Sequence, residues 1–186
     1  MAERVCPWWL GYWLASPVRK WLMEDPEKLL APYVRTGMKV LEPGPGMGFF
    51  TLPMARMVGP AGRIIAVDIQ PQMLRVLERR AQKAGLSGRI ETRIAKPEGM
   101  GVEHLAGGID FLLAVAVVHE IPSVEKFFSQ AAAVLKPGAT LLLAEPTGHV
   151  DREKFQSELD AARKAGLEAI SETAVRKSHA AVLRKV

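Results

Sequence analysis

Cysteine, aromatic residues and long apolar runs are scarce in this sequence of 186 residues. Its one cysteine, Cys6, excludes a disulfide bond within the chain and a zinc site made only of cysteines. The longest apolar stretches, such as residues 111–118, are far shorter than the roughly 20 residues of a membrane-spanning helix. The N-terminus also lacks the charged start and small-residue cleavage site of a signal peptide. We therefore expect a cytoplasmic protein without a membrane span.

The composition is that of a globular protein, with 48% hydrophobic and 24% charged residues. The formal net charge of +5 comes from scattered lysines and arginines without aromatic residues between them, which favours solvated helix faces over a nucleic-acid surface. We expect a single domain over residues 1–186, in which a helical segment, 1–36, precedes a core, 37–186. The oligomeric state stays open.

Apolar periodicity predicts an alternation of strands and helices after a proline-broken helical region at 7–34. Ser123 and Asp151 are expected N-caps, and Lys136-Pro137-Gly138 an expected helix stop. Strands are predicted over 39–41, 63–67, 89–94, 109–117, 139–144, 167–175 and 179–186, and helices over 49–58, 71–84, 123–135 and 151–165. This order predicts an α/β, doubly wound, Rossmann-like fold: a seven-stranded, mostly parallel sheet with an antiparallel C-terminal hairpin and helices on both faces.

A glycine-rich turn follows the first predicted strand. Residues 40–48 read Val-Leu-Glu-Pro-Gly-Pro-Gly-Met-Gly, so that Glu42 closes the strand and three glycines alternate after it. Such a turn lets a ligand approach the backbone, which a Cβ would block. The spacing differs from the Gly-x-Gly-x-x-Gly of dinucleotide sites, and Glu42 would repel a pyrophosphate. A cationic ligand is favoured, with a nicotinamide dinucleotide as the alternative.

With Asp68 at the end of the second strand, this motif resembles the class I S-adenosylmethionine-dependent methyltransferase family, over about residues 38–146. The resemblance implies that S-adenosylmethionine is the cofactor, that Asp68 binds both ribose hydroxyls and that Ile69 packs on the adenine. Lys96 stands where the family often has an aspartate for the adenine amino group, so Glu98 or backbone carbonyls take that role. The implied cofactor-binding residues are Glu42, Gly44, Pro45, Gly46, Gly48, Asp68, Ile69, Lys96, Pro97, Glu98 and Ala114.

Candidate catalytic residues follow the fourth strand, at the carboxyl edge where open α/β sheets bind ligands. His119 is a candidate general base, with Glu120 beside it; a purely structural histidine is the alternative. Glu145 and His149, after the fifth strand, are second candidates for contact with the substrate. Aromatic residues Trp9, Tyr12 and Trp13 could form a lid over the cofactor or simply pack on the sheet. No metal site is expected.

These features predict direct methyl transfer to a small-molecule acceptor. The family's Asn/Asp-Pro-Pro-Tyr type of signature for base amines is absent, since residues 118–122 read Val-His-Glu-Ile-Pro. The fourth-strand pattern resembles the quinone and small-metabolite branch of the family. Alternatives are an NAD(P)-dependent oxidoreductase, a non-enzymatic cofactor-binding module and an RNA methyltransferase.

Overall fold

The computed structural model describes residues 25–96 and 98–186, and the chain divides into two compact units that meet at Ala95 and Lys96. Each unit is described by itself. The helices expected before residue 25 and the aromatic residues Trp9, Tyr12 and Trp13 lie outside the described residues, as does Pro97. No helix among the described residues is long and apolar enough to cross a membrane.

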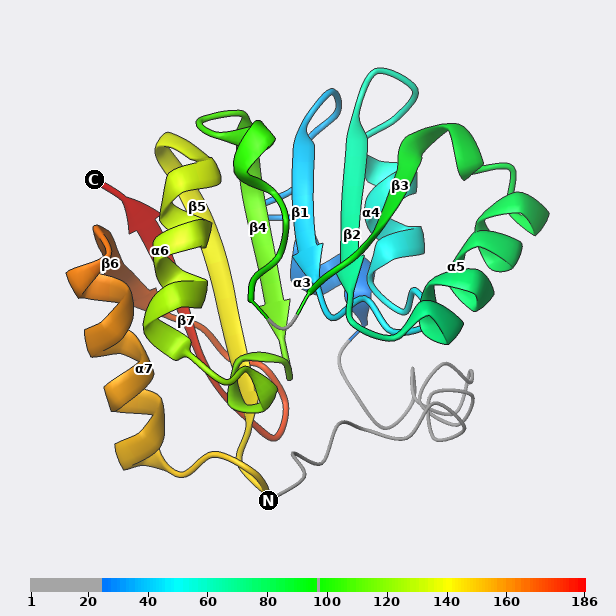
Figure 1. The fold of residues 1–186 in the computed structure, drawn as a ribbon. Coiled ribbons are helices and arrows are strands. Elements are labelled where there is room, and N and C mark those ends of the chain that lie inside the picture. The colour runs from blue at the N-terminus through cyan, green and yellow to red at the C-terminus, as the bar shows by residue number, and fades with distance from the viewer. Residues whose placement is uncertain (1–24, 97) are drawn as a thin grey trace. The chain divides into compact units, whose positions relative to one another are not determined.

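The first unit holds three parallel strands in the order β3-β2-β1 (Figure 1). Its elements are α3 (Pro26–Leu30), β1 (Lys39–Pro43), α4 (Thr51–Met57), β2 (Arg63–Asp68), α5 (Pro71–Lys83), the 3₁₀ turn η1 (Ser87–Arg89) and β3 (Ile90–Ile94). Glu42 pairs with Ala66 and Pro43 with Val67, so β1 and β2 end side by side. Parallel pairing thus places both strand-end acidic residues, Glu42 and Asp68, at one edge of the sheet.

Helix α5 forms where the sequence predicted it, because its apolar residues recur at helical spacing. Met73, Leu74 and Leu77 are buried along one face. Pro71 lies in the first turn of the helix, where backbone N–H groups have no hydrogen-bond partner within the helix, so the missing N–H of proline costs nothing. Gly85, with φ of 66°, ends the helix in the left-handed region that glycine adopts without steric cost.

The second unit holds four strands in the order β4-β5-β7-β6. Its elements are η2 (Glu103–Leu105), β4 (Ile109–Val115), η3 (Val118–Glu120), α6 (Val124–Val134), β5 (Leu135–Pro146), α7 (Arg152–Lys164), β6 (Leu167–Glu172) and β7 (Ser178–Lys185). The predicted N-caps are confirmed: Ser123 accepts from the Lys126 amide and Asp151 from the Lys154 amide. The predicted closing hairpin is also confirmed, since β6 and β7 pair antiparallel.

Helix α6 ends at Val134, within one residue of the predicted end, but the expected strand start at residue 139 is wrong, because Lys136-Pro137-Gly138 already lie inside β5. Leu135 is fully buried and pairs with Ile109, and the next paired residue is Thr140, opposite Phe111. The extra residues form an irregularity in the strand, with Gly138 at φ of 76°. The buried Leu135 therefore adds residues to the N-terminal end of β5, and Pro137 and Gly138 lie in an irregular part of this strand.

Within the second unit, β7 is antiparallel to both of its neighbours, β5 and β6. The predicted fold class, a seven-stranded, mostly parallel sheet with an antiparallel C-terminal hairpin, is confirmed.

Candidate active site

Glu42 is the most deeply buried acidic residue among residues 25–95, with 3% of its surface exposed. Its Oε2 accepts a hydrogen bond of 2.6 Å from the Thr51 hydroxyl, at the start of α4. Burial raises the pKa of Glu42 to about 8; the Thr51 hydrogen bond opposes this shift and the charge of Asp68 adds to it. A group that carries positive charge would stabilise the ionised form of this carboxyl.

Asp68 shapes the neighbouring strand end. Its Oδ1 accepts from the Gln70 amide at 2.8 Å, and its Oδ2 accepts from the Gly46 amide at 3.3 Å. Burial raises the pKa of Asp68, while hydrogen bonds from the amides of Gln70, Gly46 and Ile69 oppose the shift. The side chain thus connects the end of β2 to the glycine-rich turn.

The glycine-rich turn uses left-handed backbone at Gly44, Gly46 and Gly48, with φ of 67°, 53° and 86°. A Cβ on Gly46 would meet nothing within 4 Å, so this glycine leaves open space beside the strand ends. A Cβ on Gly48 would lie 2.5 Å from Leu77 Cδ1 of α5. The space beside Gly46 therefore remains open, whereas the absence of a Cβ at Gly48 permits close packing against α5.

Two apolar side chains stand exposed after the acidic strand ends. Ile69 directly follows Asp68, and Ile94 is the β3 residue that pairs with Asp68 in the sheet register. Large aliphatic side chains usually lie inside a protein, so a pair of them at one sheet edge suits contact with a flat apolar ring. Ile94 was not foreseen in the sequence, where it reads as an ordinary strand residue.

These residues suit S-adenosylmethionine on the chemistry of their groups. A buried carboxyl, Glu42, matches the ammonium of the cofactor's amino-acid end. A second carboxyl, Asp68, matches a pair of ribose hydroxyls, and the isoleucines match an adenine ring. A pyrophosphate would meet two carboxyl groups, which disfavours a dinucleotide at this edge.

In the second unit, Glu145 and His119 form a hydrogen-bonded pair. Glu145, near the end of β5, is fully buried. Its Oε1 accepts from the amides of Val117 at 3.1 Å and Val118 at 2.9 Å, and its Oε2 bonds to Nδ1 of His119. Ala116, at φ of 54°, turns the chain so that these amides reach the carboxyl.

This pairing determines which nitrogen of His119 is available for chemistry. A carboxylate that receives amide hydrogens at one oxygen also accepts at the other, so Nδ1 of the imidazole donates. In the neutral ring the lone pair then lies on Nε2. The hydrogen bond and charge of Glu145 raise the pKa of His119, aided by Glu120 and opposed by burial and by Lys154. His119 is therefore arranged to take up a proton at Nε2.

Other predicted residues take separate places. His149 lies near the pair, its ring centroid 5.2 Å from that of His119. Ala114 is buried within β4, and Glu120 is half-buried in η3. Lys96 pairs with Gly99 through backbone hydrogen bonds, and Glu98 lies between them in a turn of the second unit. Among the described residues, no group of three or more metal-ligating side chains could hold a metal ion.

Glu158 of α7 is a further acidic side chain that the sequence did not single out. It is buried, and neither of its carboxyl oxygens has a hydrogen-bond partner among the described residues. Burial raises its pKa to about 7, with Glu145 adding to the shift and with Lys154 and His119 opposing it. Glu158 lies three residues after the buried Phe155, on the same face of α7, and this spacing is the signal that could have predicted its burial. Charged residues on helices are usually exposed, which favours the opposite expectation.

Comparison with known proteins bears on this arrangement. A family model described as "Methyltransferase domain" matches residues 35–181. The chain is 33% identical over 115 residues to a ribosomal protein L11 methyltransferase of Pelotomaculum thermopropionicum, covering 62% of this chain and 34% of that protein. It is 31% identical over 119 residues to a ubiquinone biosynthesis O-methyltransferase of Methylocella silvestris, covering 64% and 44%. The chain thus spans less than half the length of either relative.

Solved structures agree on the fold. A SAM-dependent methyltransferase from Aquifex aeolicus superimposes with a TM-score of 0.85 at 24% identity, covering 98% of this chain and 100% of that one. At this level of identity the similarity establishes a shared fold.

Proposed function

Because the chain belongs to the methyltransferase domain family, we propose that it transfers the methyl group of S-adenosylmethionine to a small-molecule acceptor. The observation that carries the proposal is the pair of acidic strand ends, Glu42 and Asp68, beside a glycine-rich turn with open space at Gly46. This arrangement favours a cationic, ribose-bearing ligand over a dinucleotide.

In the proposed site each group holds one part of the cofactor. Glu42 binds the ammonium, Asp68 accepts hydrogen bonds from the ribose hydroxyls, and Ile69 and Ile94 cover the adenine. When bound, S-adenosylmethionine supplies a methyl group that its sulfonium has already activated. The chain therefore has mainly to orient donor and acceptor and to exclude water.

His119 is the proposed general base. An acceptor hydroxyl or ring carbon loses a proton when it is methylated, and Nε2 of His119 is the atom that would receive it. Glu145 orients the ring and stabilises the imidazolium that results, as a buried carboxylate does in other histidine-based sites. The ubiquinone biosynthesis O-methyltransferase among the similar proteins is named for transfer to an oxygen, which supports this chemistry. Trp9, Tyr12, Trp13 and His149 remain predicted contacts of the acceptor.

Cofactor choice is tested by thermal shift with S-adenosylmethionine, S-adenosylhomocysteine and NAD. At a hundredfold excess over its dissociation constant, the true cofactor stabilises the fold by about 2.7 kcal/mol. We expect both sulfur ligands to raise Tm and NAD to leave it unchanged. At the same ligand concentration Asp68→Asn should reduce the stabilisation to about 1.4 kcal/mol or less, whereas Glu27→Gln, on the exposed face of α3, should keep it. A shift with NAD alone would contradict the proposal.

The acceptor class is tested by transfer of a labelled methyl group. We expect labelling of small phenolic or hydroquinone acceptors, with none of RNA or of ribosomal protein. Labelling confined to RNA, falling steeply with added salt, would instead establish a nucleic-acid substrate. Replacing His119 by Gln removes the proposed base and should lower the rate on the small acceptor by about 10²-fold.

A further inference from the structure

Helix α5 packs one of its faces against the glycine-rich turn. Met47, which stands between the last two glycines of the turn, forms a buried cluster with Met73 and Val76 of the helix. Gly48 lies so close to α5 that a Cβ there would stand 2.5 Å from Leu77 Cδ1. The three helical residues recur at the spacing of a single face, so this face of α5 supports the turn.

Arg80 continues this face, at a position where a further apolar residue would be expected. Its Nη1 donates a hydrogen bond of 2.5 Å to the backbone carbonyl of Met47. The side chain is half-buried, and burial lowers the pKa of its guanidinium. No carboxylate in the described part of the chain forms an ion pair with it. The other basic residues of α5 are exposed: Arg75, Arg79 and Lys83. Since partial burial of an unpaired cation is costly, the contact with Met47 is the interaction that offsets this cost.

This contact fixes a peptide unit that lies between flexible residues. The Gly48 amide donates to the carbonyl of Pro45 at 2.9 Å and closes a tight turn. Gly46 has φ of 53° and Gly48 has φ of 86°, so Met47 is flanked by residues whose backbone adopts many conformations. Arg80 binds the carbonyl of the same peptide unit whose amide bonds to Pro45. Rotation of this peptide would therefore break two hydrogen bonds.

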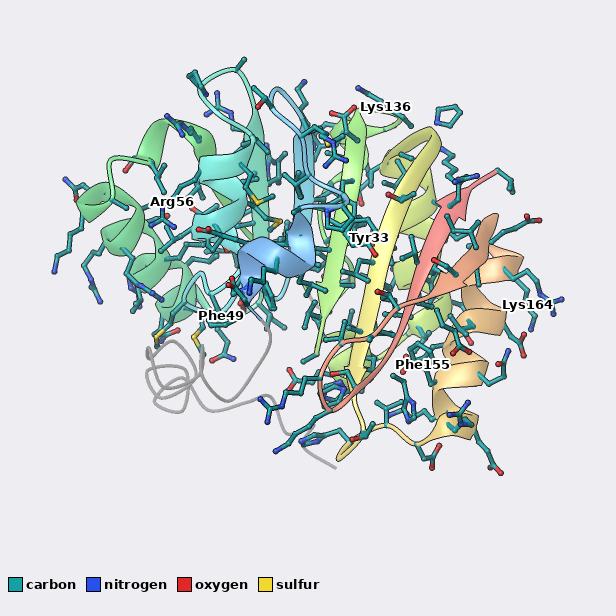
Figure 2. All side chains as sticks on the ribbon, turned by 180° about the vertical axis from the view of Figure 1, so that it is seen from behind. Tyr33, Phe49, Arg56, Lys136, Phe155 and Lys164 are labelled. Atoms are coloured by element: carbon teal, nitrogen blue, oxygen red, sulfur yellow. The ribbon has the colours of Figure 1, made fainter. Side chains whose placement is uncertain are left out.

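Other contacts fix the two sides of the turn. On the strand side, Asp68 Oδ2 accepts from the Gly46 amide at 3.3 Å. On the helix side, the turn is followed by Phe49, labelled in Figure 2, and by the buried Phe50, whose ring centroids lie 4.9 Å apart in an edge-to-face contact. The orientation of the Met47 carbonyl, between these sides, depends on a side chain from α5.

We propose that Arg80 is a positioning residue of the cofactor site: its hydrogen bond to the Met47 carbonyl keeps the glycine-rich turn in the conformation that leaves the space beside Gly46 open. This inference rests on the proposed binding of S-adenosylmethionine at this turn. Arg80 need not touch the cofactor, and no bond is made or broken at its guanidinium. Without Arg80 the turn populates other conformations, and the apparent dissociation constant increases in inverse proportion to the open fraction.

The first test compares Arg80→Met with Arg79→Met, the same chemical change at the neighbouring exposed position of α5. By calorimetry with S-adenosylhomocysteine, well below Tm, Arg80→Met should weaken binding about 5- to 20-fold, because a hydrogen bond from a charged group is lost. Arg79→Met should bind as the wild type does. Arg80→Lys keeps the charge and still carries donors, so it should recover part of the affinity. In the methyl-transfer assay, KM for S-adenosylmethionine should rise in Arg80→Met with kcat unchanged, because the occupied turn is the same.

The second test measures the turn itself, by amide relaxation dispersion in the ligand-free protein. In Arg80→Met we expect exchange on the microsecond-to-millisecond timescale at the amides of Gly46 and Gly48, which the wild type and Arg79→Met should lack. A folded Arg80→Met protein with wild-type affinity, or without this exchange, would overturn the proposal. A lower Tm with unaltered affinity would also overturn it, because Arg80 would then contribute only to stability.

A third measurement uses the wild type alone, so it decides even if Arg80→Met does not fold. Rotation of the guanidinium, followed by NMR of the Nη hydrogens, should be slow at Arg80 and fast at the exposed Arg79. Fast rotation at Arg80 would overturn the proposal. If neither S-adenosylmethionine nor S-adenosylhomocysteine binds the wild type, the proposed function is refuted, whereas the two NMR measurements still decide whether Arg80 fixes the turn.

Discussion

Cofactor binding should release a proton from Glu42. The carboxyl is buried and has a pKa of about 8, so about nine-tenths of the molecules carry the proton at pH 7 without ligand. The ammonium of S-adenosylmethionine requires the ionised form. Binding at pH 7 should therefore release about 0.9 proton per ligand, and the apparent affinity is reduced by the fraction that is ionised, about one-tenth. This reduction corresponds to about 1.4 kcal/mol.

The affinity should accordingly rise with pH. Between pH 6 and pH 7 the ionised fraction of Glu42 grows about tenfold, so the dissociation constant should fall about tenfold. The measurement should stop at pH 7.5, since an α-amino group with a pKa of about 7.7–8.0 is half deprotonated near pH 8 and would then lose its charge. Thr51→Val removes the hydrogen bond that lowers the pKa of Glu42, so this variant should bind more weakly at pH 7.

Isothermal titration calorimetry in two buffers of different ionisation enthalpy measures the released proton. Glu42→Gln should remove the release of about 0.9 proton at pH 7 and weaken binding, whereas Glu27→Gln, an exposed control, should change neither. A binding enthalpy that is independent of buffer, with a flat dissociation constant from pH 6 to pH 7.5, would refute the reasoning. So would an unaltered proton release in Glu42→Gln.

Further outcomes follow from single contacts. Asp68→Asn should weaken S-adenosylhomocysteine binding about 10- to 100-fold by calorimetry, because a hydrogen bond to a charged group contributes about 1.5–3 kcal/mol. Gly48→Ala should lower the free energy of unfolding by about 1–3 kcal/mol in urea, since its Cβ would lie 2.5 Å from Leu77 Cδ1 at a φ of 86°. Glu158→Leu should stabilise the fold more at pH 8 than at pH 4.5. The pKa of Glu158 is raised to about 7 in the folded protein, against an ordinary value of 4.5, so the folded state holds this proton more tightly than the unfolded state. The wild-type protein therefore loses stability, by a few kcal/mol at most, as the pH rises from 4.5 to 7. The acid limb of the pH–rate profile should lie above the ordinary pKa of histidine, because Glu145 raises the pKa of His119; a limb at or below that value would contradict its role as base.

The sequence by itself determined the features that depend on local backbone chemistry. The caps at Ser123 and Asp151 follow from side chains that accept a hydrogen bond from the backbone amide three residues further along the chain. The turn after β1 follows from glycines that adopt positive φ. Strand-end placement of Glu42 and Asp68 follows from the alternation of strands and helices, because parallel strands end at one edge.

Only the tertiary structure decided how the side chains pair and how charged they are. Nothing local in the sequence brings Glu145 to His119, 26 residues away, or turns Ala116 so that two amides reach the carboxyl. The start of β5 at Leu135 likewise depends on its partner Ile109. The pKa values of Glu42 and Glu158 depend on burial, which arises only when helices pack on the sheet and remove water from the carboxyl groups.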